Sequence, residues 1–149
     1  MKAVLQRVSG AGVKVDGTEV ARIGHGFLVL LGVARGDSQK ELAFLVDKIV
    51  QLRVFEDGDG KMNRSLLDCG GEMLVVSQFT LLADCKKGRR PSFFDAMPPA
   101  EAAPLVEEFA AAAANRGIIV QQGVFGATME VALVNHGPVT IVLDTDTLL

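Results

Sequence analysis

The 149-residue sequence has no tryptophan, no tyrosine and only two cysteines. With phenylalanine as its only aromatic residue type apart from two histidines, the chain is not expected to build a stacking platform from several aromatic side chains, as many binders of single-stranded RNA do. The cysteines, Cys69 and Cys85, form no CxxC pair and have no nearby histidine. We interpret them as reduced thiols, because neither a disulfide framework nor a zinc site is indicated.

Long apolar runs are also missing. Runs such as 27–31 fall far short of the ~20 residues that a membrane-spanning helix needs, and the start of the chain lacks a signal-peptide pattern. A cytoplasmic protein without membrane contact is therefore expected. The formal net charge of −3 argues against a protein that coats nucleic acid through bulk positive charge, so any such contact must be local.

The chain is predicted to form a single domain over residues 1–149. Apolar residues make up 49% of it, and no repeat or Ser/Gly-rich linker divides it. The patterns predict about seven strands and two helices. Strands are expected near the start, around a hairpin turn at Asp16-Gly17, and at 27–33, 73–79, 118–122, 129–134 and 139–143, with helices at about 38–52 and 101–116.

This order of elements predicts an α+β fold, with a mainly antiparallel, barrel-like sheet and two main helices. The continuously apolar stretch 27–33 suits a central strand that is covered on both faces. Ser38 and Glu41 form a capping-box pattern at the first helix. In the second helix, Pro104 is tolerated only if it lies in the first turn, and Gly117 suits the C-terminal cap.

Few residues suit a conventional hydrolase. The only histidines are His25, which fits a surface turn between two glycines, and His136. No GxSxG, Walker, HExxH or dinucleotide-binding motif is present, and the aspartates do not follow the EF-hand register. Neither a metal nor a cofactor is expected.

Three stretches are unusual, although each also has an ordinary interpretation. Ser77-Gln78-Phe79-Thr80-Leu81 puts hydrogen-bonding side chains where a strand ends, which is also typical of a Ser/Thr turn. Asn135-His136-Gly137-Pro138-Val139-Thr140 fits a hairpin turn. The basic cluster, made of Lys86, Lys87, Arg89 and Arg90, fits a solvated loop.

Together, however, the first two of these stretches resemble the paired signatures of the D-aminoacyl-tRNA deacylase family. Ser77-Gln78-Phe79-Thr80-Leu81-Leu82-Ala83 is similar to the first motif, and Asn135-His136-Gly137-Pro138-Val139-Thr140 to the second. The resemblance extends over essentially the whole chain. Further matching segments follow in order at 6–8, 52–55, 60–63, 87–93 and 123–127.

The resemblance implies a homodimer with two active sites at the subunit interface. It implies hydrolysis of the ester that joins a D-amino acid, or glycine, to the terminal adenosine of a tRNA. The residues that it assigns to catalysis are Ser77, Gln78, Phe79 and Thr80. Gly137 and Pro138, joined by a cis peptide bond, would reject L-amino acids from the partner's site, and Arg7 would orient them.

Other roles are less specific. Phe79, Phe125 and Met129 would line the substrate pocket, although core packing explains these three residues equally well. Phosphates of the acceptor stem would contact Lys86, Lys87, Arg89 and Arg90. Thr128 and His136 stand at non-catalytic positions where many relatives carry aspartate, so the charge near the pocket is expected to differ.

Two mechanisms remain open. The hydroxyl of Thr80 could act as a nucleophile, but the sequence offers no base to activate it. Alternatively, Thr80 positions the ester while the neighbouring ribose hydroxyl of the RNA assists attack by water, and we favour this route. The competing functions are a non-catalytic, dimeric module that binds RNA or anions, and a threonine-nucleophile hydrolase of small esters.

Overall fold

The structure is a computed structural model that describes all of residues 1–149. It contains eight strands, four α-helices and one 3₁₀ helix, η1. No helix has both the length and the apolarity needed to cross a membrane. In chain order the elements are β1 (Lys2–Val15), β2 (Thr18–Ile23), β3 (Gly26–Gly32), α1 (Gln39–Gln51), β4 (Phe55–Glu56), β5 (Met62–Arg64), α2 (Leu66–Cys69), β6 (Glu72–Ser77), η1 (Phe79–Leu82), α3 (Pro99–Asn115), β7 (Ile119–Gln122), β8 (Glu130–Asp144) and α4 (Thr145–Leu148).

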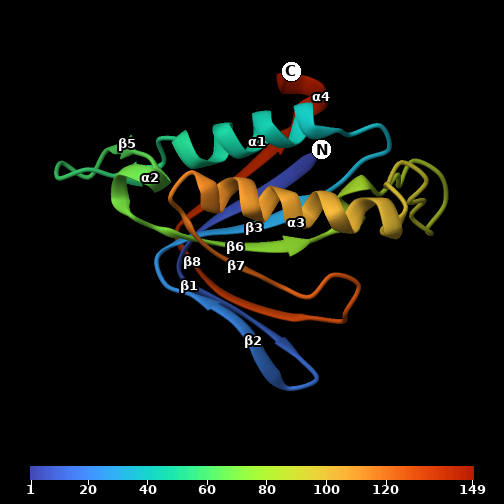
Figure 1. The fold of residues 1–149 in the computed structure, drawn as a ribbon, viewed down its shortest axis with the longest axis horizontal. Coiled ribbons are helices and arrows are strands. Elements are labelled where there is room, and N and C mark those ends of the chain that lie inside the picture. The colour runs from blue at the N-terminus through green and yellow to red at the C-terminus, as the bar shows by residue number, and fades with distance from the viewer.

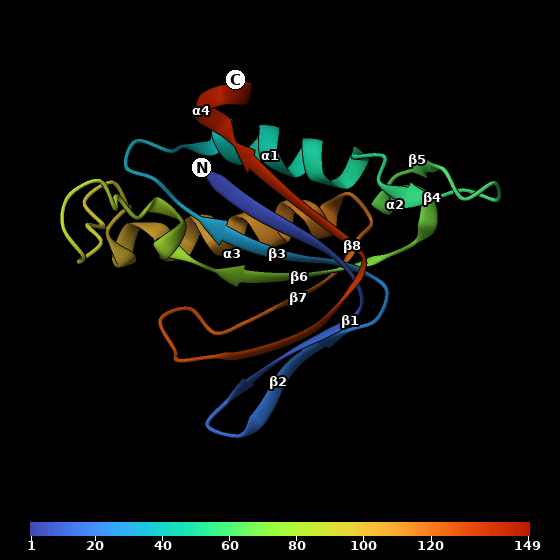
Figure 2. The same cartoon turned by 180° about the vertical axis from the view of Figure 1, so that it is seen from behind.

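A curved six-stranded sheet organises the molecule. Its order is β2-β1-β3-β6-β7, and β8 also pairs with β1. The main helices, α1 and α3, lie on one face, while β2, β7 and β8 bend around the other (Figures 1 and 2). The predicted α+β, barrel-like sheet with two main helices is thus confirmed. The sheet is mixed, because β3 pairs with β6, and β6 with β7, in parallel.

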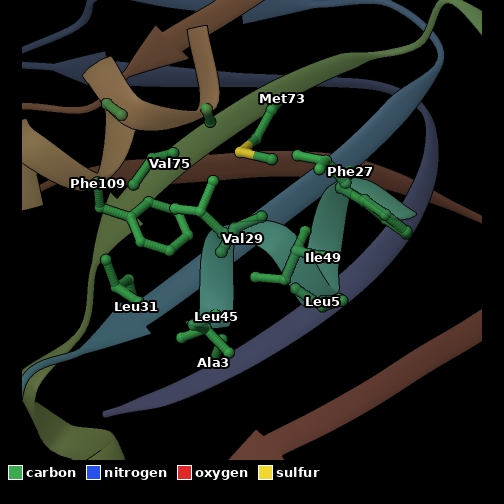
Figure 3. Packing of buried hydrophobic residues seen from close by; sticks show 14 of the residues in the cluster. Ala3, Leu5, Phe27, Val29, Leu31, Leu45, Ile49, Met73, Val75 and Phe109 are labelled. Carbon is green, nitrogen blue, oxygen red and sulfur yellow. The ribbon is translucent and has the colours of Figure 1, made fainter. Parts of the chain in front are cut away.

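Two apolar clusters fill the two sides of the sheet. Successive side chains of a strand point to opposite faces. Val29 of β3 therefore packs toward the helices, where Phe109 of α3 is buried among strand residues (Figure 3). Leu28 and Leu74 face the other way, into the interior that β1 and β2 close. This double burial explains why residues 27–33 are continuously apolar.

The helix starts differ in how well the sequence predicted them. Ser38 caps α1, and the predicted capping box with Glu41 is present. The second helix begins earlier than expected, at Pro99, so Pro104 is its sixth residue and lies beyond the first turn. That expectation was wrong. Ala100, whose carbonyl loses its usual N–H partner at position 104, is exposed, so water can bond to this carbonyl.

The second motif does not form a hairpin turn, and the two strands expected there are one. β8 runs unbroken from Glu130 to Asp144, because the 14 residues of β1 are long enough to pair with both of its halves. The register shifts around Arg7, where Gln6 pairs with Thr140 and Val8 with Asn135. Residues 136–139 therefore bulge, as expected where a proline cannot donate to the ladder.

Candidate active site

Segment 77–80 lies where β6 ends and η1 begins. The N–H group of Gln78 donates to the carbonyl of Leu31 at 2.8 Å, and the chain then turns away from the sheet. The first bond of η1 runs from the N–H of Leu81 to the carbonyl of Gln78. The N–H groups of Phe79 and Thr80 precede it and have no partner within this helix. They are suited to face a polarised oxygen.

The side chain of Gln78 fixes the hydroxyl of Thr80. Its Nε2 donates to Thr80 Oγ1 at 2.5 Å. An amide cannot take a proton from a hydroxyl at ordinary pH. This contact therefore orients Thr80 without activating it as a nucleophile.

Ser77 borders two hollows. The larger, of about 260 Å³, lies between segment 77–79 and the β7–β8 connection, which contributes Met129 and Gly126. The smaller, of about 60 Å³, lies toward α3 and includes Phe125. The structure thus brings Phe125 and Met129 to Ser77, but on different sides of it.

Exposure separates the three proposed pocket residues. Phe79 is 57% exposed and Phe125 38%, so neither is a core residue. Met129 is half-buried and packs against the interior cluster, so the core explanation holds for part of its side chain. Its Sδ also accepts from the N–H of Val124 at 3.4 Å, which holds it at the larger hollow.

The basic cluster lies in loop 84–92, at the same end of the sheet as the carboxyl end of β6 (Figures 1 and 2). Paired backbone bonds between Asp84 and Ser92 close this loop, at 2.8 and 2.9 Å. The four cations are exposed and none takes part in an ion pair: Lys86, Lys87, Arg89 and Arg90. Their charge is thus available beside the site.

The Gly137-Pro138 peptide bond is cis, and both residues are exposed. Arg7, only 3% exposed, holds the start of this bulge. Its Nε donates to the carbonyl of His136 at 2.9 Å, and its Nη1 to the carbonyl of Val54 at 2.8 Å. At Gly137 the φ angle is +136°, and a Cβ there would lie 3.0 Å from a backbone nitrogen, so another residue would be strained.

Sequence reasoning found Arg7 but missed its supports. The guanidinium is held by the backbone of Val54, and its Nη2 lies 3.7 Å from Glu56 Oε1. A backbone carbonyl leaves no trace in residue type, so no pattern could have identified Val54. The match at 52–55 was the only signal that this segment matters.

Both histidines lie near the bulge. Burial lowers the pKa of His25, and the positive charges of His136, Arg7 and Arg64 lower it further. The ring of His25 packs edge-on against Phe55. No group of three or more His, Cys, Asp or Glu side chains is placed to hold a metal ion, and the two cysteines are unpaired.

Within one chain the two motifs are far apart. The bulge lies beside Arg7, which pairs with Phe27 of β3, which in turn pairs with Met73 of β6. Ser77 lies four residues further along β6. At about 4.8 Å between strands and 3.3 Å per residue, the separation is about 20 Å. Measured along the sheet, the bulge and segment 77–80 of one chain are therefore well separated.

Comparison with known proteins supplies the family. The family model described as D-Tyr-tRNA(Tyr) deacylase matches residues 4–144. D-aminoacyl-tRNA deacylases of Geotalea uraniireducens (strain Rf4) and Thermus aquaticus are 61% and 56% identical over 145 residues. These alignments cover 97% of this chain, and 94% and 95% of the relatives.

Solved structures agree in fold. The c-Myc DNA Unwinding Element Binding Protein is 45% identical, with a TM-score of 0.92 over 97% of this chain and 99% of its own. A probable eukaryotic D-amino acid tRNA deacylase, 20% identical, shares the fold, with a TM-score of 0.80 over 95% and 97% of the two chains. Since the family model and the relatives match over nearly the full length, the chain belongs to the D-aminoacyl-tRNA deacylase family and is a hydrolase of D-aminoacyl-tRNA.

Proposed function

We propose that the enzyme acts as a homodimer, in which segment 77–80 of one subunit holds the ester and Gly137-Pro138 of the partner subunit excludes L-amino acids. The observation that carries this proposal is the separation of about 20 Å between the two motifs within one chain. Phe79 and Thr80 of the first motif are exposed, as are Gly137 and Pro138 of the second, so a second copy of the chain can supply what each motif lacks.

Selection by exclusion suits this substrate. D and L esters have the same polarity and differ only in where the side chain leaves Cα, so attraction alone separates them poorly. If rigid backbone occupies the place where the side chain of an L-amino acid would lie, the L ester overlaps with it. No rearranged hydrogen bond recovers the energy lost to that overlap. Arg7 supplies the rigidity, since it is buried and bonded to two carbonyls. Glycine has no side chain to exclude, so glycyl-tRNA is also a substrate.

Hydrolysis proceeds by attack of water on the ester carbonyl, assisted by the neighbouring ribose hydroxyl. The bond between the carbonyl carbon and the ribose oxygen breaks, and that oxygen takes a proton that comes from the attacking water. The products are the free amino acid and free tRNA. The N–H groups of Phe79 and Thr80 stabilise the developing oxyanion, and Ser77 and Gln78 position the ester. Phe125 and Met129 border the bound aminoacyl-adenosine.

The remaining contacts are electrostatic. The basic cluster, Lys86, Lys87, Arg89 and Arg90, contacts acceptor-stem phosphates, and the tRNA substrate places the activity in the cytoplasm. The two positions where relatives carry aspartate, Thr128 and His136, are exposed. Because neither side chain is a carboxylate, the surface around them is less negative than an aspartate would make it, which favours contact with RNA.

The first test compares D-tyrosyl-tRNA with L-tyrosyl-tRNA. We expect preferential release of tRNA from the D form. Equal, background release from both would favour a non-catalytic module that only binds RNA.

The second test uses heterodimers of two variants with different tags. Gln78→Ala with Thr80→Ala impairs the ester segment, and its homodimer should be much slower than the wild type on both substrates. The second variant, Pro138→Ala, disrupts the proposed wall, by which we mean the Gly137-Pro138 backbone that excludes L-amino acids. Its homodimer should hydrolyse L-tyrosyl-tRNA. In the heterodimer one site combines both intact motifs. We expect about half of the wild-type rate on the D substrate and background release from the L substrate.

Rapid hydrolysis of the L substrate by this heterodimer would mean that the wall acts within its own chain. A protein that sediments as a monomer at assay concentration would also contradict the proposal. The homodimer of each variant serves as a matched control.

A further inference from the structure

Three of the eight phenylalanines gather next to the ester segment. Phe79, Phe93 and Phe94 are 57%, 36% and 73% exposed. The ring of Phe93 stands edge-on to Phe79, with centroids 5.0 Å apart. The guanidinium of Arg35 lies 5.0 Å from the centroid of Phe94. The sequence did not predict that several aromatic side chains would meet on the surface.

Hydrogen bonds to backbone carbonyls hold this patch in place. Arg35 Nε donates to the carbonyl of Phe94, and the N–H of Arg35 donates to the carbonyl of Asp95 at 2.9 Å. The N–H of Met97 donates to the carbonyl of Val33 at 2.9 Å. The segment that carries both rings is thus tied to the connection between β3 and α1. Its exposed rings belong to an ordered surface.

The charge around the patch is positive. Residues 84–95 contain four cations and two aspartates, and Arg35 adds another cation, on a chain whose net charge is −3. Beside Arg35 lies a cleft of about 510 Å³ that also carries Lys2, Lys86, Asp84, Asp95 and Asp146, so its acidic and basic side chains balance. The outer face, with the rings and the basic cluster, is the better anion surface.

We propose that Phe93, Phe94 and Arg35 form a stacking platform for the unpaired nucleotides that precede the terminal adenosine of the tRNA. Exposed aromatic rings combined with cations are the usual means of binding single-stranded nucleic acid, because every base has a face that can stack. The platform adjoins Phe79 of the ester segment and leads to the basic cluster. The proposal rests on the proposed placement of the ester at segment 77–80.

Substrate length provides the first test. In Phe94→Leu we expect KM for D-aminoacyl-tRNA to rise about fivefold or more, with kcat unchanged, because base stacking is lost. KM for D-aminoacyl-adenosine, which lacks the preceding nucleotides, should not change. The matched control is Phe44→Leu, since Phe44 on α1 also lies beneath a cation, Lys48, at 5.6 Å.

Two outcomes would overturn the platform. Equal effects on the long and the short substrate would place Phe94 in the ester site or in the folding of the loop, and no effect on either would leave it without a role. Failure of the proposed ester site is a separate result, since Gln78→Ala with Thr80→Ala would then leave the release of amino acid from D-aminoacyl-adenosine unchanged.

Fluorescence provides a second readout. Because the chain has no tryptophan, Phe94→Trp introduces the only one. We expect uncharged tRNA to quench this residue, and tRNA trimmed of its unpaired 3′ end to quench it much less, while Phe44→Trp responds to neither. If dilution of the protein alone changes the signal of the residue at position 94, a second copy of the chain covers the patch and the proposal fails.

Discussion

At the scale of single residues, two side chains hold the two motifs in place through hydrogen bonds. Gln78 orients the hydroxyl of Thr80 and cannot act as its base. Arg7 joins two backbone carbonyls behind the bulge. The motif residues were visible in the sequence, because hydroxyls and amides stand out where a strand should stay apolar. The partners of Arg7 were not visible, because they are main-chain atoms brought close only by the fold.

The role of Thr80 can be tested directly. Loss of a catalytic nucleophile lowers kcat by a factor on the order of 10⁶. If Thr80 only positions the ester, Thr80→Ala should lower kcat by less than about 10²-fold, the lower limit for removing one oxyanion donor. Single-turnover release of amino acid from D-tyrosyl-tRNA measures this, with Thr18→Ala on β2 as control.

The same assay with a modified substrate separates the two mechanisms. A D-aminoacyl-tRNA whose terminal ribose lacks the free neighbouring hydroxyl should be almost inert with the wild type. Normal turnover of this deoxy substrate would rule out assistance by the RNA.

At the scale of elements, local sequence patterns predicted those helices and strands whose bounds are determined by neighbouring residues. The capping box marked the start of α1, and the apolar run marked β3. β8 could not be predicted as one strand, because Gly137-Pro138 is a turn signal and the partner that overrides it, β1, lies more than a hundred residues away. Pro104 misled for a different, local reason, since α3 begins at Pro99 and Pro104 therefore lies beyond its first turn.

The capping box leads to a prediction about stability and pH. Hydrogen bonds from the hydroxyl and then the N–H of Ser38 lower the pKa of Glu41 from its ordinary value of 4.5. A lowered carboxyl pKa adds stability above the unfolded value, and this stability is lost as the pH falls through the folded value. Ser38→Ala should cost about 1 kcal/mol at pH 7, and less as the pH falls below 4.5.

Urea unfolding at several pH values measures this difference. Ser9→Ala is the control, because Ser9 is exposed on β1 and its side chain makes no hydrogen bond. A cost of Ser38→Ala that stayed constant down to pH 3 would show that Glu41 contributes nothing to the cap.

At the scale of the whole molecule, an acidic protein carries a local cluster of cations. The net charge of −3 conceals a loop with four cations at one end of the sheet. Composition predicted that RNA contact must be local, and the fold class followed from the order of strands and helices. The expectation of a dimer came from the family resemblance alone, because a surface shared between copies leaves no periodic signal in a single sequence.

Salt dependence tests the basic loop. Each cation that contacts a phosphate contributes about one unit to the slope of log affinity against log salt concentration. Lys87→Ala and Arg90→Ala should each reduce this slope by about one in filter-binding measurements with uncharged tRNA. Lys14→Ala, an exposed cation on β1, should leave the slope unchanged. Equal slopes for all three variants would remove the loop from the RNA contact.

β8 also restricts which insertions and deletions the sequence can tolerate. Val131 borders the hollow of its own subunit, and Gly137 follows six residues later in the same strand, about 20 Å away. Because side chains alternate between faces, inserting or deleting one residue between these positions would invert everything downstream. The number of residues in this strand therefore sets the position of the proposed Gly137-Pro138 wall relative to the hollow at Val131.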